Sequence, residues 1–269
     1  MPVRDTPWPA GTPCWVDLAT PDLPKAVEFY SAVLGWSLQD KGEEFGHYNI
    51  AEVDGRAAAG IGPVMEEGQP SFWTVYLATE DADGTAKLIS EHGGSLLFEP
   101  MDVPEQGRMA IATDPTGAVF GIWQANGMNG IGVYNEPGGL YWEDARLTDP
   151  EAGKRFYAEV FGYTYQAVPG APDDYGTFHA GGDPLGGMGG MMGLPEGTPS
   201  HWVAYFAVAN TDAAVAAVEQ AGGTVLMPGF DTPYGRMAAV ADPFGASFMV
   251  MQAAEIGIAT SRGARRGGS

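Results

Sequence analysis

A pattern of apolar and polar residues near the start of the chain defines its folding unit. In residues 14–36, a short apolar run is followed by Asp22, by Pro24, by apolar side chains at helical spacing, and then by Gly35. An acidic cap, a proline in the first turn and a glycine after the last turn are typical helix boundaries. The pattern therefore predicts a strand, an amphipathic helix, and another strand soon after the glycine.

This unit is repeated later in the chain. Residues 141–163 match residues 14–36 without a gap. The identical pairs are Trp15 and Trp142, Asp17 and Asp144, Asp22 and Asp149, Phe29 and Phe156, Tyr30 and Tyr157, Val33 and Val160, and Gly35 and Gly162. We conclude that the chain is an internal duplication.

Each half of the duplication contains two such units. After the first predicted helix, residues 37–41, 47–53 and 56–64 are expected to form three short strands with Gly and Asp between them. A second unit begins at residues 71–97, which correspond to residues 200–226 in the second half. The sequence therefore predicts four units of one strand, one helix and three strands (βαβββ), which is an α+β architecture.

The duplication also sets the expected domain boundaries. We predict a first domain at residues 1–125 and a second at residues 140–256, joined by a Gly- and Asn-rich linker at residues 126–139. The proline-rich residues 1–13 are expected to lie as an arm over the fold. Residues 257–269 are expected to be a disordered tail.

Composition narrows the possible partners and the compartment. The formal net charge is −21, from 34 acidic and 13 basic residues, and phosphate binding needs clustered Lys and Arg, so no nucleic acid partner is expected. The single cysteine excludes a disulfide within the chain. The sequence shows no signal-peptide pattern and no apolar stretch long enough to span a membrane. We therefore expect a cytoplasmic monomer or homodimer that does not bind membranes.

Three motifs together resemble a known superfamily. The segment from Asp22 to Gly35, with residues 114–117 (DPTG) and 242–245 (DPFG) before the last strand of each half, resembles the vicinal-oxygen-chelate superfamily. That superfamily includes glyoxalase I, extradiol dioxygenases and bleomycin-resistance proteins. The resemblance covers residues 12–254 and is greatest to tandem actinobacterial members described as hydroxylase-like, some of which accompany aromatic polyketide pathways. It implies two tandem glyoxalase-like domains with cupped mixed sheets.

The resemblance also implies where a metal ion would bind. In metal-bearing members, His, Glu or Gln ligands project into the cup from the first and last strands of the units. The corresponding positions here are Trp15, Gly60, Thr74 and Gly121 in the first half and Trp142, Gly187, Val203 and Met249 in the second. None of these residues offers imidazole or carboxylate. We therefore expect that the metal site is lost and that no cofactor is bound.

A different set of residues in the second half could still bind a metal ion. Asp144, His179 and His201 could supply three ligands, although their spacing is not that of the superfamily. The alternative is that both histidines are polar lining or surface residues. His47 and His92 are expected at the surface.

The side chains expected to face the cups suit a flat, apolar small molecule. Aromatic rings can stack on such a ligand, thioethers adapt to its shape, and a few polar groups can orient it. The predicted ligand-binding residues are Trp15, Asp17, Tyr76, Trp123, Trp142, Asp144, Arg146, His179, Met188, Met191, His201, Tyr205 and Met251.

Several of these residues also have a purely structural interpretation. Trp15 and Trp142 could line the cups or could fill the space that a metal ion occupied. Asp17 and Asp144 could form a shared bond to the backbone or place an acid in each cup. Trp73 and Trp202, on the opposite strand face, are expected in the core. Arg108 and Arg236 lie in equivalent Gly-Arg-Met segments, which favours salt bridges over substrate binding.

Three functions are compatible with these residues. The first is a metal-free protein that binds a planar aromatic metabolite or antibiotic, and sequesters it or presents it to a tailoring enzyme of the same pathway. The second is a metal-independent, hydroxylase-like tailoring enzyme, with Asp144 as general base and Tyr205 or His201 as hydrogen-bond donor. The third, a metal-dependent dioxygenase or glyoxalase, conflicts with the residues at the expected ligand positions.

Overall fold

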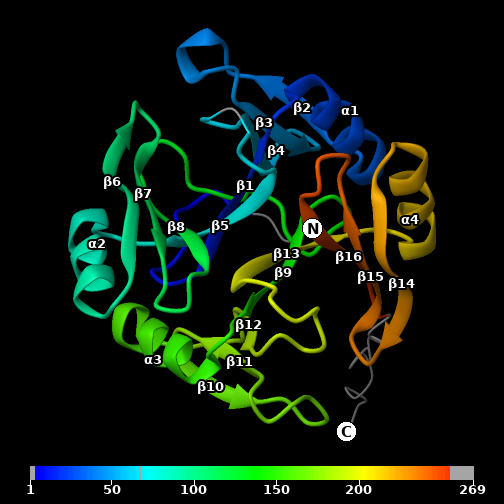
Figure 1. The fold of residues 1–269 in the computed structure, drawn as a ribbon. Coiled ribbons are helices and arrows are strands. Elements are labelled where there is room, and N and C mark those ends of the chain that lie inside the picture. Colours follow the sequence, from blue (N-terminus) through cyan, green and yellow to red (C-terminus); the bar gives the residue numbers. More distant parts are fainter. Residues whose placement is uncertain (1–3, 67, 255–269) are drawn as a thin grey trace, which may run out of the picture.

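The computed structural model describes residues 4–66 and 68–254 (Figure 1). The first half contains β1 (Pro13–Thr20), α1 (Leu23–Leu34), β2 (Ser37–Asp40), β3 (Asn49–Val53), β4 (Arg56–Pro63), β5 (Phe72–Ala78), α2 (Ala82–Glu91), β6 (Ser95–Val103), β7 (Gly107–Thr113) and β8 (Val119–Ala125). A short 3₁₀ helix (Glu43–Phe45) lies between β2 and β3. This order contains the two predicted βαβββ units.

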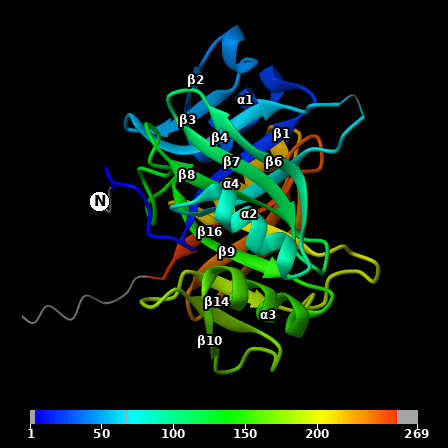
Figure 2. The same ribbon diagram turned by 90° about the vertical axis from the view of Figure 1, so that its left-hand side faces the viewer.

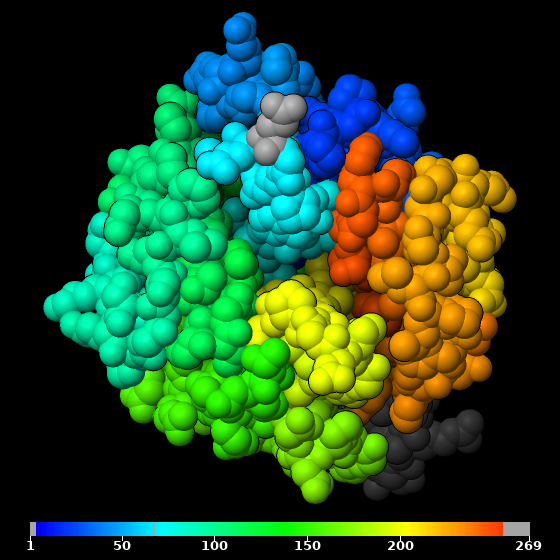
Figure 3. All heavy atoms as spheres, viewed as in Figure 1, coloured from blue at the N-terminus to red at the C-terminus, as the bar shows by residue number. Residues whose placement is uncertain are grey.

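The second half repeats this order. It contains β9 (Leu140–Arg146), α3 (Pro150–Phe161), β10 (Thr164–Ala167), β11 (Gly176–His179), β12 (Gly186–Gly189), β13 (His201–Ala207), α4 (Thr211–Gln220), β14 (Thr224–Thr232), β15 (Gly235–Ala241) and β16 (Ser247–Ala253). The predicted α+β architecture with four units is therefore confirmed. The four units lie around the molecule as successive sectors (Figure 3).

The ends of the first helix in each half follow the sequence signals. The side chain of Asp22 accepts a hydrogen bond from the backbone N–H of Lys25 at 3.1 Å, and Asp149 accepts one from Ala152 at 3.0 Å. These bonds satisfy N–H groups that have no partner within the helix. Gly35 ends α1 in the left-handed conformation, with φ of 70°, which glycine adopts without strain.

Each half forms one continuous eight-stranded sheet from its two units. The strand orders are β2-β3-β4-β1-β5-β8-β7-β6 and β10-β11-β12-β9-β13-β16-β15-β14. In each sheet the first strands of the two units pair antiparallel, β1 with β5 and β9 with β13. Parallel pairs on either side, such as β1 with β4 and β5 with β8, make both sheets mixed, as predicted.

The two sheets pack against each other through one face each. The rings of Trp73 and Phe206 from opposite halves lie 5.1 Å apart, and those of Tyr30 and Phe248 lie 5.5 Å apart. Helix α1 contacts α4, and α2 contacts α3, across the same boundary (Figures 1 and 2). We call these packed surfaces the core faces and the opposite surfaces the outer faces. Trp73 and Trp202 lie in the core, as predicted.

Hydrogen bonds join the halves inside this core. The indole N–H of Trp73 donates to Tyr30 at 3.1 Å, and the Tyr30 hydroxyl donates to Asp242 in the other half at 3.2 Å. The duplication repeats the first bond, because Trp202 donates to Tyr157 at 2.9 Å. The Tyr30–Asp242 bond crosses between the halves, so it helps to align the two sheets.

The arm and the linker hold the start of each sheet. The indole of Trp8 donates to the carbonyl of Ile131 at 3.1 Å, and Trp36 donates to Gly138 at 2.6 Å. The predicted placement of the arm over the fold agrees with these bonds. The predicted tail at residues 257–269 lies outside the described residues.

Two further features concern the surface. Arg108 binds Asp83 and Asp102, and Arg236 binds the equivalent Asp212 and Asp231, so the salt-bridge interpretation of both arginines is correct. Within residues 4–66 and 68–254, no helix is long and apolar enough to cross a membrane.

The buried carboxyl group of Glu143 provides a test of the packing between halves. Glu143 lies on the core face, and burial, reinforced by the charge of Asp144, raises its pKa well above the ordinary value. In the unfolded chain the group ionises from about pH 4 upward. A rise in pH therefore favours the unfolded state until the folded pKa is reached.

We predict that Glu143→Val, which places there the residue found at the equivalent Val16, is more stable than the native chain at about pH 8 by about 1–3 kcal/mol. This difference in the free energy of unfolding between Glu143→Val and the native chain should become smaller toward about pH 5. Urea unfolding at both pH values measures the difference, with Glu143→Gln as the isosteric control. A gap that is independent of pH would contradict the buried, neutral state of Glu143.

Candidate functional site

A partly buried carboxyl group lies at the centre of the outer face in the first half. Asp17 on β1 accepts hydrogen bonds at its Oδ2 atom from the hydroxyls of Tyr76, at 3.0 Å, and Tyr48, at 3.3 Å. The indole N–H of Trp15 donates to the Tyr48 hydroxyl at 3.0 Å. Trp15, Asp17, Tyr48 and Tyr76 form what we call the first floor.

Bare backbone at two glycines makes room for this floor. Gly60 is paired with Asp17 across β4 and β1, and Gly121 is paired with Tyr76 across β8 and β5. A Cβ atom on Gly60 would lie 1.7 Å from the hydroxyl oxygen of Tyr48, and one on Gly121 would lie 2.1 Å from the ring of Tyr76. The two phenol rings therefore occupy the space that side chains at residues 60 and 121 would need.

The second half contains an equivalent set, the second floor, formed by Trp142, Asp144, Tyr175 and Tyr205. The carboxyl group of Asp144 accepts hydrogen bonds from Tyr205 at 2.6 Å, Tyr175 at 2.9 Å and Trp142 at 3.1 Å. A Cβ atom on Gly187 would lie 2.0 Å from the Tyr175 hydroxyl. The duplication has thus kept the indole, the carboxyl group and both phenols.

The two floors differ in one cation. Arg146 lies two residues beyond Asp144 on the same strand face and binds its carboxylate at 2.5 Å and the Tyr205 hydroxyl at 3.3 Å. Its guanidinium carbon also lies 5.4 Å from the Tyr175 ring centre, a cation–π contact. The equivalent residue in the first half is Ala19, which offers no charge.

This difference determines the electrostatics of the floors. Burial raises the pKa of Asp17 to about 7, although hydrogen bonds from Tyr76 and Tyr48 act in the opposite direction. Burial alone would lower the pKa of Arg146, but the charge of Asp144 and the nearby phenols hold it above its ordinary value. The first floor therefore holds a carboxyl group that can exchange a proton near neutral pH, whereas the second holds an ion pair.

Apolar side chains continue each outer face beyond the floor and form what we call the walls. Strand register places Phe98 opposite Ile111 and Met101 opposite Met109 in the first half. In the second half Phe230 lies opposite Met237, and Met227 and Met249 both lie opposite Ala239. Phe98, Met101 and Met227 are 43%, 51% and 47% exposed. Large apolar side chains on an open sheet face are typical of binding surfaces.

The structure brings together the predicted indole and aspartate of each half, Trp15 with Asp17 and Trp142 with Asp144. It also shows what the two aspartates bond to. Asp17 and Asp144 bond to phenols and not to the backbone, so the structural interpretation of these acids was wrong. Trp15 is only 4% exposed and fills the floor, whereas Trp142 is partly exposed. Tyr76, Arg146 and Tyr205 lie in the floors as expected on an outer face.

Other predicted residues lie at the margins. Met251 and Trp123 are on the outer faces but only 3% and 7% exposed, and Trp123 donates to the carbonyl of Met128 at 2.9 Å. Met191 follows β12 and is partly exposed. Met188 was placed on the wrong face. It pairs with Ala145, is fully buried and belongs to the core, because the strand register alternates it with Gly187.

The two histidines do not assemble a metal site with Asp144. The ring nitrogens of His179 lie 2.9 Å from the Gly182 carbonyl and from the Thr177 hydroxyl, and Nδ1 of His201 lies 2.8 Å from the Pro199 carbonyl. In the part of the chain that the structure describes, no group of three His, Cys, Asp or Glu residues is placed to hold a metal ion. The proposed set of Asp144, His179 and His201 was therefore wrong.

The superfamily's metal does not fit the positions that the resemblance implied. Gly60, Gly121 and Gly187 have no donor atom in a side chain, and the tyrosine rings leave no room for one. Each floor supplies a single carboxyl group, whereas protein sites for divalent metals use several imidazole or carboxylate ligands.

The fold and the site together define a class of protein. Paired βαβββ units that share one eight-stranded sheet, with polar residues at the centre of its outer face, define a glyoxalase-like protein. The model of the glyoxalase/bleomycin resistance protein/dioxygenase superfamily matches residues 14–122 and 144–250, so the chain belongs to this superfamily.

Comparison with known sequences gives relatives of the same length. The chain is 37% identical to the "putative glyoxylase CFP32" of Mycobacterium tuberculosis, over 94% of this chain and 99% of that protein. It is 34% identical to the "anthracycline biosynthesis protein DnrV" of Streptomyces peucetius, over 91% of this chain and 94% of that protein. The corresponding protein DauV of Streptomyces sp. strain C5 is 33% identical, over 94% and 98%.

Solved structures share the fold at low sequence identity. The Mn(II)-bound glyoxalase from Novosphingobium aromaticivorans aligns with a TM-score of 0.64 at 12% identity, over 90% of this chain and 82% of that chain. The 2,3-dioxygenase LapB from Pseudomonas sp. KL28 aligns with a TM-score of 0.63 at 14% identity, over 90% and 93%. At these identities the likeness concerns the fold alone.

The packing of Tyr48 on Gly60 can be tested by stability. We predict that Gly60→Ala destabilises the protein by about 1–3 kcal/mol, because the added methyl group overlaps the Tyr48 hydroxyl. In the Tyr48→Ala background the same substitution should cost much less, so a double-mutant cycle measured by urea unfolding reports the contact.

Gly182→Ala is the matched control, because a Cβ atom there meets no atom within 4 Å. Equal effects of Gly60→Ala with and without Tyr48 would show that the ring does not fill this space.

Proposed function

We propose that this protein binds a planar aromatic metabolite or antibiotic on its outer faces without a metal ion. It would sequester this ligand, or present it to a tailoring enzyme, in an aromatic polyketide-type pathway. The observation that carries the proposal is a carboxyl group bonded to two phenols, with an indole in the same cluster and exposed apolar side chains farther along the same sheet face, in both halves of the chain.

The floors supply the polar recognition that such a ligand requires. Quinone and phenol oxygens accept and donate hydrogen bonds at the edges of a flat ring system. The Asp17 carboxyl group can donate or accept at the first floor, and the Asp144–Arg146 pair offers both signs at the second. A small number of oriented polar groups is what fixes a mostly apolar ligand.

The walls supply the apolar contact area. Phe98 and Met101 in the first half, and Met227 in the second, expose large side chains on the same sheet faces as the floors, on the edge strands β6 and β14. Covering a side chain of this size contributes about 1.5–3 kcal/mol. Thioether groups also adapt to ligands of different ring number, which suits a family of related metabolites.

The relatives support the pathway context. DnrV and DauV are described as anthracycline biosynthesis proteins, and each matches this chain over more than nine tenths of its length. Anthracyclines carry a planar, oxygen-bearing aromatic ring system, so the chemistry of the relatives' pathway agrees with the walls and floors described above.

A second candidate function is metal-independent proton transfer by Asp17. The sequence placed a general base at Asp144, but that group is ion-paired with Arg146, whereas Asp17 has two phenols and no cation as hydrogen-bond partners. As a carboxylate, Asp17 would take the proton of a phenolic hydroxyl of the ligand. The negative charge would then lie on the phenolate oxygen of the ligand, and Tyr76 would remain a hydrogen-bond donor in the site.

Ligand binding can be measured with 1,4-dihydroxyanthraquinone as the probe. We predict saturable quenching of tryptophan fluorescence, because Trp15 and Trp142 belong to the floors. Phe98→Asp and Met227→Asp should each weaken binding at one face by about tenfold, since each removes at least 1.4 kcal/mol of apolar contact and adds a charge.

Leu88→Asp on α2 is the matched control, because Leu88 is exposed on a helix away from the outer faces. Absence of saturable quenching, or equal binding by all three variants, would count against the binding proposal.

Proton transfer to Asp17 predicts a spectral change in the same probe. At about pH 8 the absorption band of dihydroxyanthraquinone bound to the native chain should shift to longer wavelength than that of the free dye, because a phenolic hydroxyl of the dye donates its proton in a hydrogen bond to the Asp17 carboxylate. Asp17→Asn should abolish this shift and Asp144→Asn should retain it, because the amide cannot accept the proton. An identical shift in both variants would exclude Asp17 as the acceptor.

A further inference from the structure

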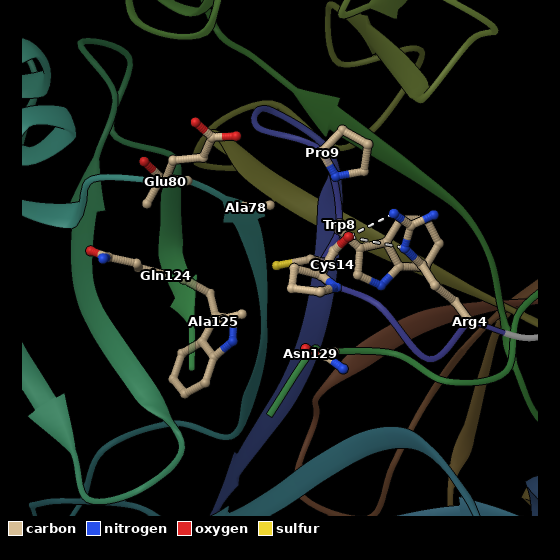
Figure 4. A pocket seen from close by; sticks show the side chains of 12 residues that line it. Arg4, Trp8, Pro9, Cys14, Ala78, Glu80, Gln124, Ala125 and Asn129 are labelled. Carbon is tan, nitrogen blue, oxygen red and sulfur yellow. Dashed lines mark hydrogen bonds between the residues drawn. The ribbon is translucent and has the colours of Figure 1, made fainter. Parts of the chain in front are cut away.

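A cavity separate from the floors lies at one end of the first sheet. It has a volume of about 430 Å³ and is formed where β1 begins, where β5 and β8 end, and where the arm crosses them. Its lining residues are Arg4, Pro7, Trp8, Pro9, Cys14, Ala78, Thr79, Glu80, Trp123, Gln124, Ala125 and Asn129. Figure 4 shows Glu80 and Gln124 on one side of this space and Trp8 and Asn129 on the other.

Two indoles are fixed at this cavity with their N–H groups already bonded. Trp8 donates to the carbonyl of Ile131 at 3.1 Å, and Trp123 donates to the carbonyl of Met128 at 2.9 Å. The rings are therefore held in place and do not need a polar partner from a ligand. Fixed aromatic surfaces of this kind favour flat, apolar molecules.

The base of the cavity is apolar and uncharged. Cys14 is only 1% exposed, and burial, reinforced by the charge of Glu143, raises the pKa of its thiol far above the ordinary value. The thiol is therefore protonated and behaves as a small apolar group. Arg4 and Glu80, of opposite charge, both line the cavity, so the site has no excess of either sign.

Two residues of this cavity differ between the halves of the duplication. In the second half Tyr141 is the counterpart of Cys14 and Met251 of Trp123, whereas Ala78 and Gln124 are repeated as Ala207 and Gln252. The turn that precedes each sheet is the same, because Gly11 donates to Ala78 and Gly138 donates to Ala207, both at 2.8 Å. The shared backbone course at this end of the sheet therefore does not require Cys14 or Trp123.

We propose that this cavity is a second ligand site, which takes a neutral planar aromatic molecule of one or two rings in contact with Trp8 and Trp123. A volume of about 430 Å³ lies in the lower part of the range of about 300–1,000 Å³ for small-molecule sites, which suits one or two rings better than a tetracyclic ligand. Amide groups of Gln124 and Asn129 at the lining suit a hydroxyl or carbonyl substituent on the ring.

The site can be tested with 2-naphthol, using the indole N–H signals of the seven tryptophans in ¹H–¹⁵N NMR spectra. Trp→Phe variants assign the signals. We expect saturable shifts at Trp8 and Trp123 and no shift at Trp15 or Trp142. Cys14→Tyr, which places the second-half residue at the base, should weaken 2-naphthol binding at least tenfold.

A second variant keeps the test decisive if Cys14→Tyr does not fold. Trp8→Ala changes only the arm, outside both sheets, and should weaken 2-naphthol binding to a similar degree. Phe98→Asp, on the outer face, should leave 2-naphthol binding unchanged. Cys14→Tyr, at the cavity, should leave 1,4-dihydroxyanthraquinone binding unchanged. The two probes therefore distinguish failure of this site from failure of the proposed outer-face function. Unchanged affinity in Trp8→Ala, or shifts confined to Trp15 and Trp142, would overturn the proposal.

Discussion

The packing of two sheets through one buried aromatic layer is the interaction on which the rest of the molecule depends. Trp73 and Phe206 meet across it at 5.1 Å, and Tyr30 bonds Trp73 on its own side and Asp242 on the other. This layer uses the core faces and the helices, so the centres of the outer faces do not take part in it. They hold polar groups such as Asp17, which is bonded to Tyr48 and Tyr76.

The fold could be predicted because the duplication gives two independent copies of each signal. Asp22 and Asp149 cap their helices in the same way, and Gly35 ends α1 as the spacing indicated. A pattern that occurs twice at matching positions reflects a backbone requirement, so the order of strands and helices followed directly. The pairing of the units within each sheet did not, since strand order depends on contacts distant in sequence.

The site was only partly predictable, for two physical reasons. Tyr48 and Tyr175 lie just before β3 and β11. Residues 47–53 were predicted as one strand, but β3 begins at Asn49, so the alternation of the strand does not give the direction of the Tyr48 side chain. Comparison of the halves would have found them, since both lie at the same place in the repeat. Met188 was assigned to the wrong face because a glycine-rich strand has few side chains to show its register, and a shift of one residue exchanges the faces.

The two floors show two ways to stabilise a carboxyl group at the centre of a sheet face. A carboxylate removed from water must either bind a proton or have a cation nearby. Asp17 follows the first course, with a pKa of about 7, and Asp144 follows the second, with Arg146 at 2.5 Å. Which of the two ways is used depends on a single position of the repeat, which is Ala19 in the first half and Arg146 in the second. The phenols and the indole are common to both floors, so Arg146 gives the second face a charge that the first face lacks at Ala19. The first face can therefore exchange a proton with a ligand near neutral pH, whereas the second presents an ion pair.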